Sequence, residues 1–478
     1  MGVYHLKVLL VNPPKFKGSF VQREDRCECI DHDTCVPTIS LACLAQTTAK
    51  EGHTVKLVDA NAYNLSLEQV RKEIEEFQPD FLVFRAIPPT LTHDVEVAKL
   101  AKSIDGNITT VMLCFSLIPQ YEKVLRTFPE VNVHVTDIFF ENFLPELFTT
   151  LSFENTDGIA YWDAGEIRRN KENSDYSFNF SPDWSLLPDF SPFFTRSKAM
   201  KPWGVSETTR NCPFGCKFCI LANSRYVKRP VANVLSELEY LIKVRKLRYL
   251  NFYDPTFALD KNFTYELLNE IIRANIHFKW YTNTRCDLLD EDILKRMREA
   301  GCRGLSLGIE FGNDEVLIRS KKGSTVQLNF DTIQLLRKVG IKSYGSFVMG
   351  VPFETKKQMQ DTVDFIKRSK LNGFQLNIWT PYQGTSFYKE LQEEGLVNPD
   401  DVKWDDMNWD RPSKSFCELS VEELIQFRKQ AYHSIYFNTG WLFSNVRWLL
   451  RHPEDVRIAT SYFSGMMNRV IHSFEFSH

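Results

Sequence analysis

Short runs of apolar residues alternate with stretches of helical periodicity in the first third of the chain. Two helical patterns, Leu41–Lys50 and Leu67–Phe77, lie between runs that have the composition of strands. These runs are Lys7–Val11, Thr54–Asp59, Phe81–Phe84, Thr109–Leu113 and Asn132–Val135. Apolar strands that alternate with helices are typical of a parallel sheet covered on both faces. We therefore predict an α/β fold that begins with a five-stranded, doubly wound (Rossmann-like) sheet over residues 1–152.

The pattern changes after residue 152 and later returns. Residues 153–200 combine a hairpin pattern, Gly158–Arg169, with a polar stretch of prolines and aromatics that is typical of a linker. Over residues 201–395 the strand patterns are Tyr249–Tyr253, Phe278–Asn283, Leu305–Glu310, Ser343–Gly350 and Phe374–Thr380. With one strand before Cys212 these make six β/α units, so we predict a partial (β/α)6 TIM barrel. Residues 396–478 are predicted to form a mostly helical region.

The composition is that of a globular protein without a membrane span. Hydrophobic residues make up 43% of the chain and charged residues 25%. No window reaches the roughly 18 apolar residues that a transmembrane helix requires, and the N-terminus lacks a signal-peptide pattern. We therefore expect a cytoplasmic protein. A formal net charge of −3 gives no electrostatic reason to expect a nucleic-acid partner.

Three of the 11 cysteines stand close together on a predicted loop. Cys212, Cys216 and Cys219 follow one another at spacings of four and three residues, and Gly215 lets the loop bend. Three thiolates on one loop can bind three irons of a cubane and leave the fourth iron open for substrate chemistry. We therefore predict that these cysteines hold a [4Fe–4S] cluster.

Other metal-binding arrangements fit the sequence less well than this cluster. A structural zinc knuckle needs a fourth Cys or His at short range, and none follows before His277. Such a knuckle would suit a nucleic-acid-binding protein, whose best feature here is the basic stretch Lys243–Arg248. A second metal site could involve residues near the N-terminus, although their spacing matches no familiar set: Cys27, Cys29 and Cys35.

The pattern C-x3-C-x2-C, with Phe218 just before the last cysteine, resembles the radical S-adenosylmethionine (SAM) superfamily. In that family the open iron binds SAM. One electron from an external donor such as flavodoxin or ferredoxin then cleaves SAM to methionine and a 5′-deoxyadenosyl radical. That radical abstracts hydrogen from a substrate carbon, so no acid–base catalytic residue is assigned. The family fold is a six-unit partial barrel with the cluster loop after its first strand.

Segments at the predicted carboxyl ends of strands support this resemblance. Asp254 lies in a segment that resembles D-D-x-F of the branch that carries cobalamin, with a proline in place of the second Asp. Arg285 ends the third strand and could pair with the SAM carboxylate. Gly308 and Glu310 belong to a segment similar to G-I-E-S-G, and Glu310 could hold the ribose hydroxyls or the ammonium group of SAM. The resemblance implies a SAM site that includes these four residues and Phe218.

The first domain resembles the cobalamin-binding domain that precedes the barrel in one branch of the superfamily. Val8–Pro14, Pro37–Ala45 and Gly52–Asp59 fit the opening of that domain. The chain departs from it in two loops, where Cys114–Leu117 replaces a Gly-Gly pair and Thr136–Glu141 replaces a G-E-G-E-like turn. The resemblance implies cobalamin, whereas the bulky replacements leave open a domain that serves only as a scaffold or substrate wall.

The resulting expectation is a radical SAM methyltransferase that uses cobalamin to methylate an unactivated carbon. One alternative is a radical SAM enzyme without cobalamin, which would catalyse rearrangement, cyclisation, C–C coupling or sulfur insertion. Another is a nucleic-acid-binding protein with a metal knuckle. The 37 phenylalanines hint at a small-molecule substrate that is apolar or lipid-like.

Overall fold

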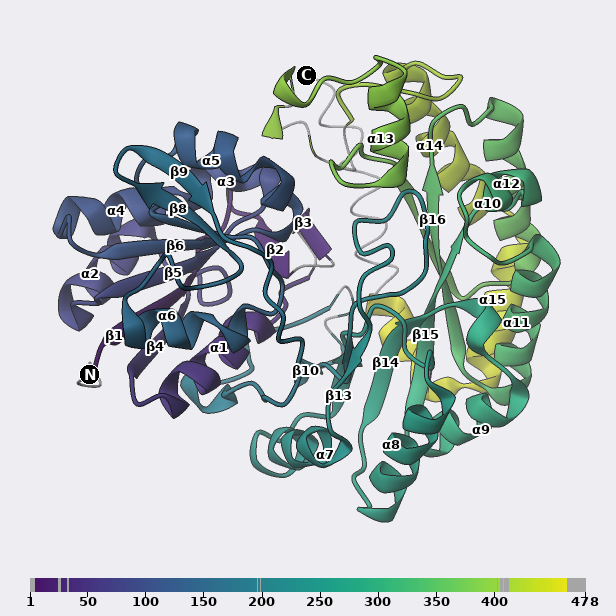
Figure 1. Ribbon diagram of the computed structural model, residues 1–478. Helices are drawn as coiled ribbons and strands as arrows, with labels where there is room; N and C mark the ends of the chain where they lie inside the picture. The colour runs from purple at the N-terminus through teal and green to yellow at the C-terminus, as the bar shows by residue number, and fades with distance from the viewer. Residues whose placement is uncertain are drawn as a thin grey trace. The chain divides into compact units, whose positions relative to one another are not determined.

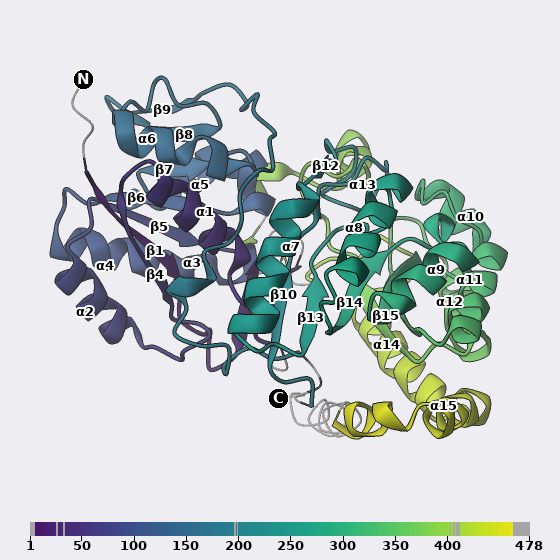
Figure 2. The same cartoon turned by 90° about the horizontal axis from the view of Figure 1, so that it is seen from below.

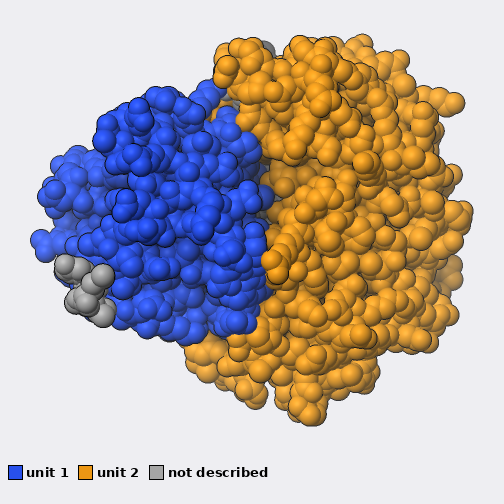
Figure 3. Space-filling view, in the orientation of Figure 1, with its two compact units in different colours: residues 1–194 blue, residues 195–478 orange. Residues whose placement is uncertain are grey.

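The computed structural model describes residues 5–461, apart from 25–26, 32–33, 196, 198, 402, 405–406 and 408–411 (Figure 1). The chain forms two compact units, Met1–Phe194 and Thr195–His478, which Figure 3 shows in different colours. Each unit is built on one main parallel sheet. Within the described ranges, no helix is both long enough and apolar enough to cross a membrane.

Unit 1 contains a seven-stranded sheet in the order β4-β1-β5-β6-β7-β8-β9. Its parallel strands confirm the five predicted from the sequence: β1 (Lys7–Asn12), β4 (Thr54–Asp59), β5 (Phe81–Arg85), β6 (Thr109–Leu113) and β7 (Val133–Val135). The predicted hairpin, β8 (Ile159–Asp163) and β9 (Glu166–Arg169), extends the sheet with antiparallel strands. Because β4 and β5 pair on opposite sides of β1, the topological switch point lies between β1 and β5.

Helices cover both faces of this sheet (Figure 1). On one face α2 (Leu67–Phe77) packs beside α4 (Glu96–Ile104), and on the other α1 (Ile39–Lys50) packs beside α6 (Leu144–Thr150). α1 buries most of its side chains, whereas α2 buries only two, as a surface helix does. Two shorter helices complete the layers: α3 (Leu91–Asp94) and α5 (Tyr121–Thr127).

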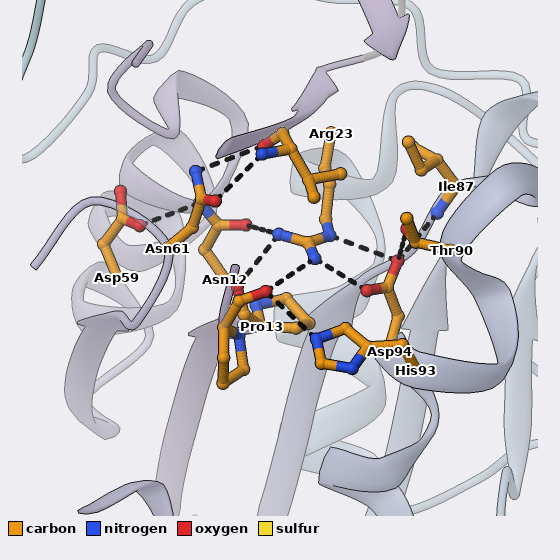
Figure 4. A network of polar contacts seen from close by, with 11 residues as sticks. Asn12, Pro13, Arg23, Asp59, Asn61, Ile87, Thr90, His93 and Asp94 are labelled. Carbon is orange, nitrogen blue, oxygen red and sulfur yellow. Dashed lines mark hydrogen bonds and ion pairs between the residues drawn. The ribbon is translucent and has the colours of Figure 1, made fainter. Parts of the chain in front are cut away.

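A second hairpin, β2 (Phe20–Glu24) and β3 (Cys27–Asp31), follows β1 and is not evident in the sequence pattern. Arg23 lies on β2 with its side chain fully buried (Figure 4). Its guanidinium donates to Asn12 Oδ1 at 3.1 Å and to the carbonyl oxygens of Pro13 and Pro14 at 2.9 and 3.1 Å. It also forms an ion pair of 2.7 Å with Asp94. These contacts fix the hairpin over the carboxyl end of β1, at the switch point.

The segment that follows β9 runs along unit 1. Its aromatic side chains Trp184 and Phe193 are buried, and the Phe193 ring lies 6.2 Å from the ring of Tyr63. The backbone N–H of Asp183 donates to the carbonyl oxygen of Ala42 on α1. Residues 170–194 are therefore ordered against unit 1 by burial and by hydrogen bonds.

Unit 2 contains an open six-stranded parallel sheet in chain order, which confirms the predicted partial barrel. Its strands are β10 (Trp203–Ser206), β13 (Tyr249–Phe252), β14 (Lys279–Thr284), β15 (Cys302–Glu310), β16 (Lys342–Met349) and β17 (Gly373–Ile378). The helices between them are α7 (Val231–Glu239), α8 (Lys261–Arg273), α9 (Glu291–Glu299), α10 (Asp314–Arg319), α11 (Val326–Val339) and α12 (Lys356–Ser369). Figures 1 and 2 show these helices on the outer side of the sheet.

Caps explain where several of these helices begin. The side chains of Asp260, Asp290 and Thr325 accept the third backbone N–H of α8, α9 and α11 respectively. Thr355 and Gln358 form a capping box at the start of α12. Each capping residue sits in the loop just after a strand or at a turn, so the sequence itself marks these helix starts.

The two faces of the barrel strands differ in burial. Along β14, β15 and β16 fully buried residues alternate with half-buried ones. The buried set faces the helices: Trp280 Nε1 donates to the carbonyl oxygen of Ala300 beyond α9, and the Phe347 ring contacts Phe365 on α12. The half-buried set therefore faces the interior of the barrel.

The last part of the described chain is mostly helical, as predicted. α13 (Ser386–Glu393), α14 (Val421–Tyr436) and α15 (Thr439–Arg451) follow the last strand. α14 and α15 both contact α12, so they add to the outer layer of unit 2. Beyond α15, Asp455 forms an ion pair of 2.8 Å with Lys342 at the start of β16.

The Arg23–Asp94 pair yields a stability prediction. Asp94→Ala leaves a buried guanidinium without its counter-charge, so we expect the free energy of unfolding to fall by about 3–5 kcal/mol. Glu96→Ala breaks a half-exposed pair with Lys99 and should cost at most about 1 kcal/mol. Replacing both partners, as Arg23→Met with Asp94→Leu, should recover part of the loss. Denaturant unfolding measures these free energies. Equal losses of stability for Asp94→Ala and Glu96→Ala would contradict the prediction.

Candidate functional site

The cysteine loop is closed at its base by a short antiparallel ribbon. Before the loop lies β11 (Thr209–Arg210) and after it β12 (Val227–Lys228), and the two strands pair with each other. Asn211 turns the chain with a φ of 67°, and its side-chain amide donates to the carbonyl oxygen of Arg225 at 3.0 Å. The loop therefore starts and ends at neighbouring points on the carboxyl side of β10.

Hydrogen bonds inside the loop fix its backbone. The N–H of Cys212 donates to Ser224 Oγ at 3.0 Å, and the N–H of Ser224 donates back to the carbonyl oxygen of Cys212 at 3.1 Å. The N–H of Cys219 donates to the carbonyl oxygen of Cys216 at 3.1 Å. These bonds hold the three predicted cluster ligands on one compact turn.

The three thiols differ in their surroundings. Cys216 is buried, while Cys212 and Cys219 are partly exposed. Cys212 Sγ lies 3.5 Å from the hydroxyl of Thr256, beyond the end of β13. Within the described residues, no three His, Cys, Asp or Glu side chains converge as ligands of a single metal ion. A cubane poses a different requirement, because each thiolate binds a separate iron.

Arg285 follows β14 and lies against the cysteine loop. Its Nη1 donates to Cys216 Sγ at 3.7 Å, and its guanidinium lies 3.8 Å from the centre of the Phe214 ring. Asp287 accepts from Nε and Nη2 at 2.9 and 2.8 Å. The structure thus brings Arg285 to a predicted cluster ligand, with its guanidinium already paired with the carboxylate of Asp287.

Glu310 ends β15 with an unusual backbone. Its φ is 68°, and the pairing of β15 with β16 shifts register between Gly308 and Glu310. A non-glycine residue in this conformation is costly and is found mostly where function requires a defined side-chain direction. Here the carboxylate meets Lys322, whose Nζ lies 3.2 Å from Glu310 Oε1.

Lys322 is a site residue that the sequence analysis missed. It is 5% exposed, and the nearby Glu310 and Cys216 raise its pKa against the opposing effect of burial, which is the largest single influence. Burial raises the pKa of the Cys216 thiol, while Lys322 and Arg285 act to lower it. The residue stands in the run Lys321–Lys322–Gly323, and nothing in that run distinguishes a buried lysine from a solvated one.

Gly308 makes room for this ion pair. A Cβ atom at residue 308 would lie 2.7 Å from Glu310 Oε1 and 3.0 Å from Lys322 Nζ. A side chain at this position would force the ends of Glu310 and Lys322 to shift, so glycine leaves the space in which this pair forms. The predicted residues Gly308 and Glu310 therefore act together with Lys322.

Asp254 and Phe218 have structural contacts that the sequence did not specify. Asp254 is fully buried after β13, and its carboxylate accepts from the N–H groups of Thr208 and Thr209 at 2.7 and 3.2 Å. It thereby holds the strand that leads into the cysteine loop. The Phe218 ring meets the Phe311 ring edge-on at 5.8 Å, beside the end of β15. Both residues position the loop against the strand ends.

The interior face of the barrel carries uncharged polar side chains. Asn283, Ser306, Ser346, Gln375 and Asn377 all belong to the half-buried set. By strand register Asn283 lies beside Ser306, and Ser346 lies beside Gln375. Gln375 Nε2 donates to Asn377 Oδ1 at 2.6 Å. The side chains of the other three form no hydrogen bond with another described residue. This face can therefore offer amides and hydroxyls to a bound molecule.

The remaining early cysteines lie at separate positions of unit 1. Cys29 on β3 and Cys35 are buried, and the backbone of Cys35 pairs with that of Phe194. The side chain of Cys27 falls outside the described residues, although its backbone belongs to β3. The described part of the chain gives these cysteines no common metal site.

Two family models match the chain. Residues 206–366 match the radical SAM superfamily, and residues 29–112 match the B12 binding domain. The first range contains the cysteine loop, Arg285, Glu310 and Lys322, and the second covers β4, β5 and most of β6 in the sheet of unit 1. Both matches agree with the branch that the sequence resembles.

Curated relatives span nearly the whole chain. An uncharacterized methyltransferase of Pyrococcus horikoshii is 27% identical over 92% of this chain and 95% of its own length. An anaerobic magnesium-protoporphyrin IX monomethyl ester cyclase of Rubrivivax gelatinosus is 26% identical over 85% of this chain and 75% of its own. The chain is therefore similar to enzymes of more than one reaction type.

Solved structures share the fold. The radical SAM methyltransferase TsrM from Kitasatospora setae, with cobalamin and a [4Fe–4S] cluster bound, superposes with a TM-score of 0.65 at 20% identity. It covers 82% of this chain, and the chain covers 75% of it. The cobalamin-dependent radical SAM enzyme OxsB gives a TM-score of 0.63 at 17% identity, over 90% of this chain and 62% of its own. Because both family models match one chain, the metal-knuckle alternative is not supported, and the chain combines a radical SAM domain with a B12-binding domain ahead of it.

Proposed function

We propose that this chain is a cobalamin-dependent radical SAM methyltransferase that acts on a carbon atom of a small molecule. The observation that carries the proposal is the joint presence of a cysteine loop at the carboxyl side of a partial barrel and a B12-binding match in unit 1. The methyltransferase name of a relative aligned over nearly its whole length supports the reaction type. In this proposal residues 1–152 form the cobalamin-binding domain and residues 153–200 form the linker and hairpin that follow it. Residues 201–395 form the barrel that binds the cluster and SAM, and residues 396–478 form a helical C-terminal region.

The residues of the loop fit a [4Fe–4S] cluster. Cys212, Cys216 and Cys219 would hold it, because three thiols on one fixed turn are the donor set that a cubane with one open iron requires. When bound, the cluster supplies the electron that cleaves SAM. Arg285 and Lys322 place positive charge beside Cys216 and so favour the thiolate form that binds iron.

The pair of Glu310 and Lys322 suits the charged end of SAM. An amino acid carries an ammonium and a carboxylate on one carbon, and this pair presents the two complementary charges 3.2 Å apart. A lysine ammonium has three donors, and among the described residues Lys322 uses one, on Glu310. We assign Lys322 to the SAM carboxylate and Glu310 to its ammonium or ribose hydroxyls. The guanidinium of Arg285 forms an ion pair with Asp287 and stabilises the cysteine loop beside Glu310 and Lys322.

The carboxyl edge of unit 1 fits cobalamin better than the loop sequences suggest. The bulky residues after β7 are turned inward: Phe139 and Phe140 are buried, and the Phe139 ring packs edge-on against Tyr176 at 5.5 Å. Thr136 Oγ1, at the end of β7, is buried and has no hydrogen-bond partner among the described residues. When bound, cobalamin supplies the methyl carrier. The chain would contribute the Thr136 hydroxyl as a hydrogen-bonding group, at an edge from which the Phe139 and Phe140 rings are turned away.

The barrel interior favours a polar substrate. Its amides and hydroxyls would be left unpaired by a hydrocarbon chain, which costs about 1–3 kcal/mol for each buried group. We therefore favour a small molecule with uncharged hydrogen-bonding groups over the lipid-like substrate suggested by the phenylalanine content. The electron would come from an external donor such as flavodoxin or ferredoxin, in a cytoplasm that keeps the thiols reduced.

Cys216→Ala should abolish both the cluster and SAM cleavage. Two thiolates cannot hold three irons, so anaerobically reconstituted variant protein should lose nearly all its iron and sulfide and form no 5′-deoxyadenosine with dithionite. Cys417→Ala, at a partly exposed cysteine after α13, is the matched control and should retain both. Iron analysis and chromatography of the SAM products provide the measurement. A Cys216→Ala protein with a full cluster would contradict the assignment.

Lys322→Met should weaken SAM binding while the cluster remains. A hydrogen bond to a charged group contributes about 1.5–3 kcal/mol, so the KM for SAM should rise by roughly 10- to 150-fold. Lys321→Met, which removes the adjacent lysine, should change it by less than a factor of about 2. Iron content and the visible spectrum are measured alongside. A variant with an unchanged KM would remove Lys322 from the proposed SAM site.

Cobalamin binding separates the proposal from a radical enzyme without cobalamin. Protein reconstituted with hydroxocobalamin should retain about one cobalt per chain after gel filtration. After a strong reductant has converted the cobalt to Co(I), the bound corrin should accept labelled methyl from SAM. Thr136→Val should lower the affinity by roughly 5- to 10-fold, the value of one hydrogen bond. Protein that cleaves SAM but holds no cobalt would favour the alternative without cobalamin.

A further inference from the structure

Helix α15 is anchored to unit 2 through one face only. Trp441 and Trp448 point inward and are buried, and Trp448 Nε1 donates to Asp455 Oδ2 at 3.1 Å. Asn445, on the same face, donates through its side-chain amide to the carbonyl oxygen of Leu371 at 3.2 Å. These contacts bind the helix firmly to the outer layer of unit 2, at whose margin it lies in Figure 2.

The opposite face of α15 is apolar and exposed. Phe443 and Leu450 are 74% and 79% exposed, Val446 is 52% and Leu442 is 39%. Leu442, Val446 and Leu450 recur every four residues, so they form one stripe along the helix, with Phe443 beside it. A helix that is apolar on both faces is expected to be covered on both. Among the described residues the outer face is not covered.

Arginines border this stripe without counter-charges. Arg447 and Arg451 are exposed on α15, one turn apart, and neither forms an ion pair with a described residue. Burial lowers the pKa of Arg337 on α11, and the nearby positive charges of Arg451 and Arg447 lower it further. Arg337 Nη2 donates to the carbonyl oxygen of Ser444, which keeps it against α15. No acidic residue occurs in α15 itself. The positive charges of Arg447 and Arg451 therefore favour an anionic partner.

We propose that the outer face of α15 docks on an anionic lipid surface. The stripe would enter the boundary between headgroups and acyl chains, while Arg447 and Arg451 would reach the phosphates beside it. A second copy of the chain fits less well, because a twofold contact of this face with itself would bring the arginines of both copies together. Residues 462–478 carry one arginine and one glutamate and so offer no surplus of negative charge.

Vesicle binding tests this inference with the full-length protein. Vesicles of phosphatidylcholine with 30% phosphatidylglycerol should bind the protein at low salt, and pure phosphatidylcholine vesicles should bind it roughly 10-fold less. Phe443→Ser with Leu450→Ser should lower the partition coefficient by about 10-fold or more, since both side chains leave the lipid. Arg447→Gln and Arg451→Gln should each lower it by about 5-fold.

The matched control is Leu151→Ser after α6, where a leucine 44% exposed has no Lys or Arg within ten residues in the sequence and the change should leave binding unaltered. Iron content should be the same for all variants, because every altered side chain is exposed. Equal binding to neutral vesicles, no binding to either kind of vesicle, or an equal loss with Leu151→Ser would each overturn the proposal. A concentration-dependent dimer that the Phe443/Leu450 variant abolishes would overturn it in favour of a second copy.

Discussion

A buried ammonium is stable only where opposite charge and hydrogen bonds replace the water it has lost. Lys322 meets this condition through Glu310, whose backbone adopts a positive φ and whose carboxylate occupies the space left by Gly308. The same ammonium acts on Cys216, where Arg285 also makes contact. Electrostatic contacts thus connect three segments: the end of β14, the end of β15 and the cysteine loop. The rest of unit 2 brings these three segments together.

Both units place their chemistry at the carboxyl edge of a parallel sheet, but they close that edge differently. In unit 1 the β2–β3 hairpin lies over the switch point, and the buried guanidinium of Arg23 satisfies carbonyl oxygens that strand ends would otherwise expose. In unit 2 the edge is left open around the cysteine loop, and polar side chains continue down the inner face of the strands. The hairpin therefore makes the first edge rigid at the switch point. The second edge carries polar side chains that a bound molecule could contact.

Periodicity and spacing predicted most of this arrangement from the sequence. The strands, the partial barrel and the three cysteines follow from local patterns that need no tertiary information, and Glu310 and Arg285 follow from resemblance. Lys322 could not be predicted, because burial of one lysine in a run of two depends on the bulge at Glu310. The role of Asp254 in holding Thr208 and Thr209 depends equally on strand order. The polar interior emerges only when register sets Ser306 and Ser346 on one face.

The ribbon that closes the cysteine loop affects how the loop can recover after oxidative damage. Its strands, the paired bonds between Cys212 and Ser224 and the turn at Asn211 all run within the polypeptide, so the loop keeps its shape without help from iron. Iron–sulfur cubanes with an open iron are readily destroyed by oxidation. In the proposed role of these cysteines as cluster ligands, such a loop would present the same three thiols again once they are reduced, so that a lost cluster could be rebuilt on the same polypeptide.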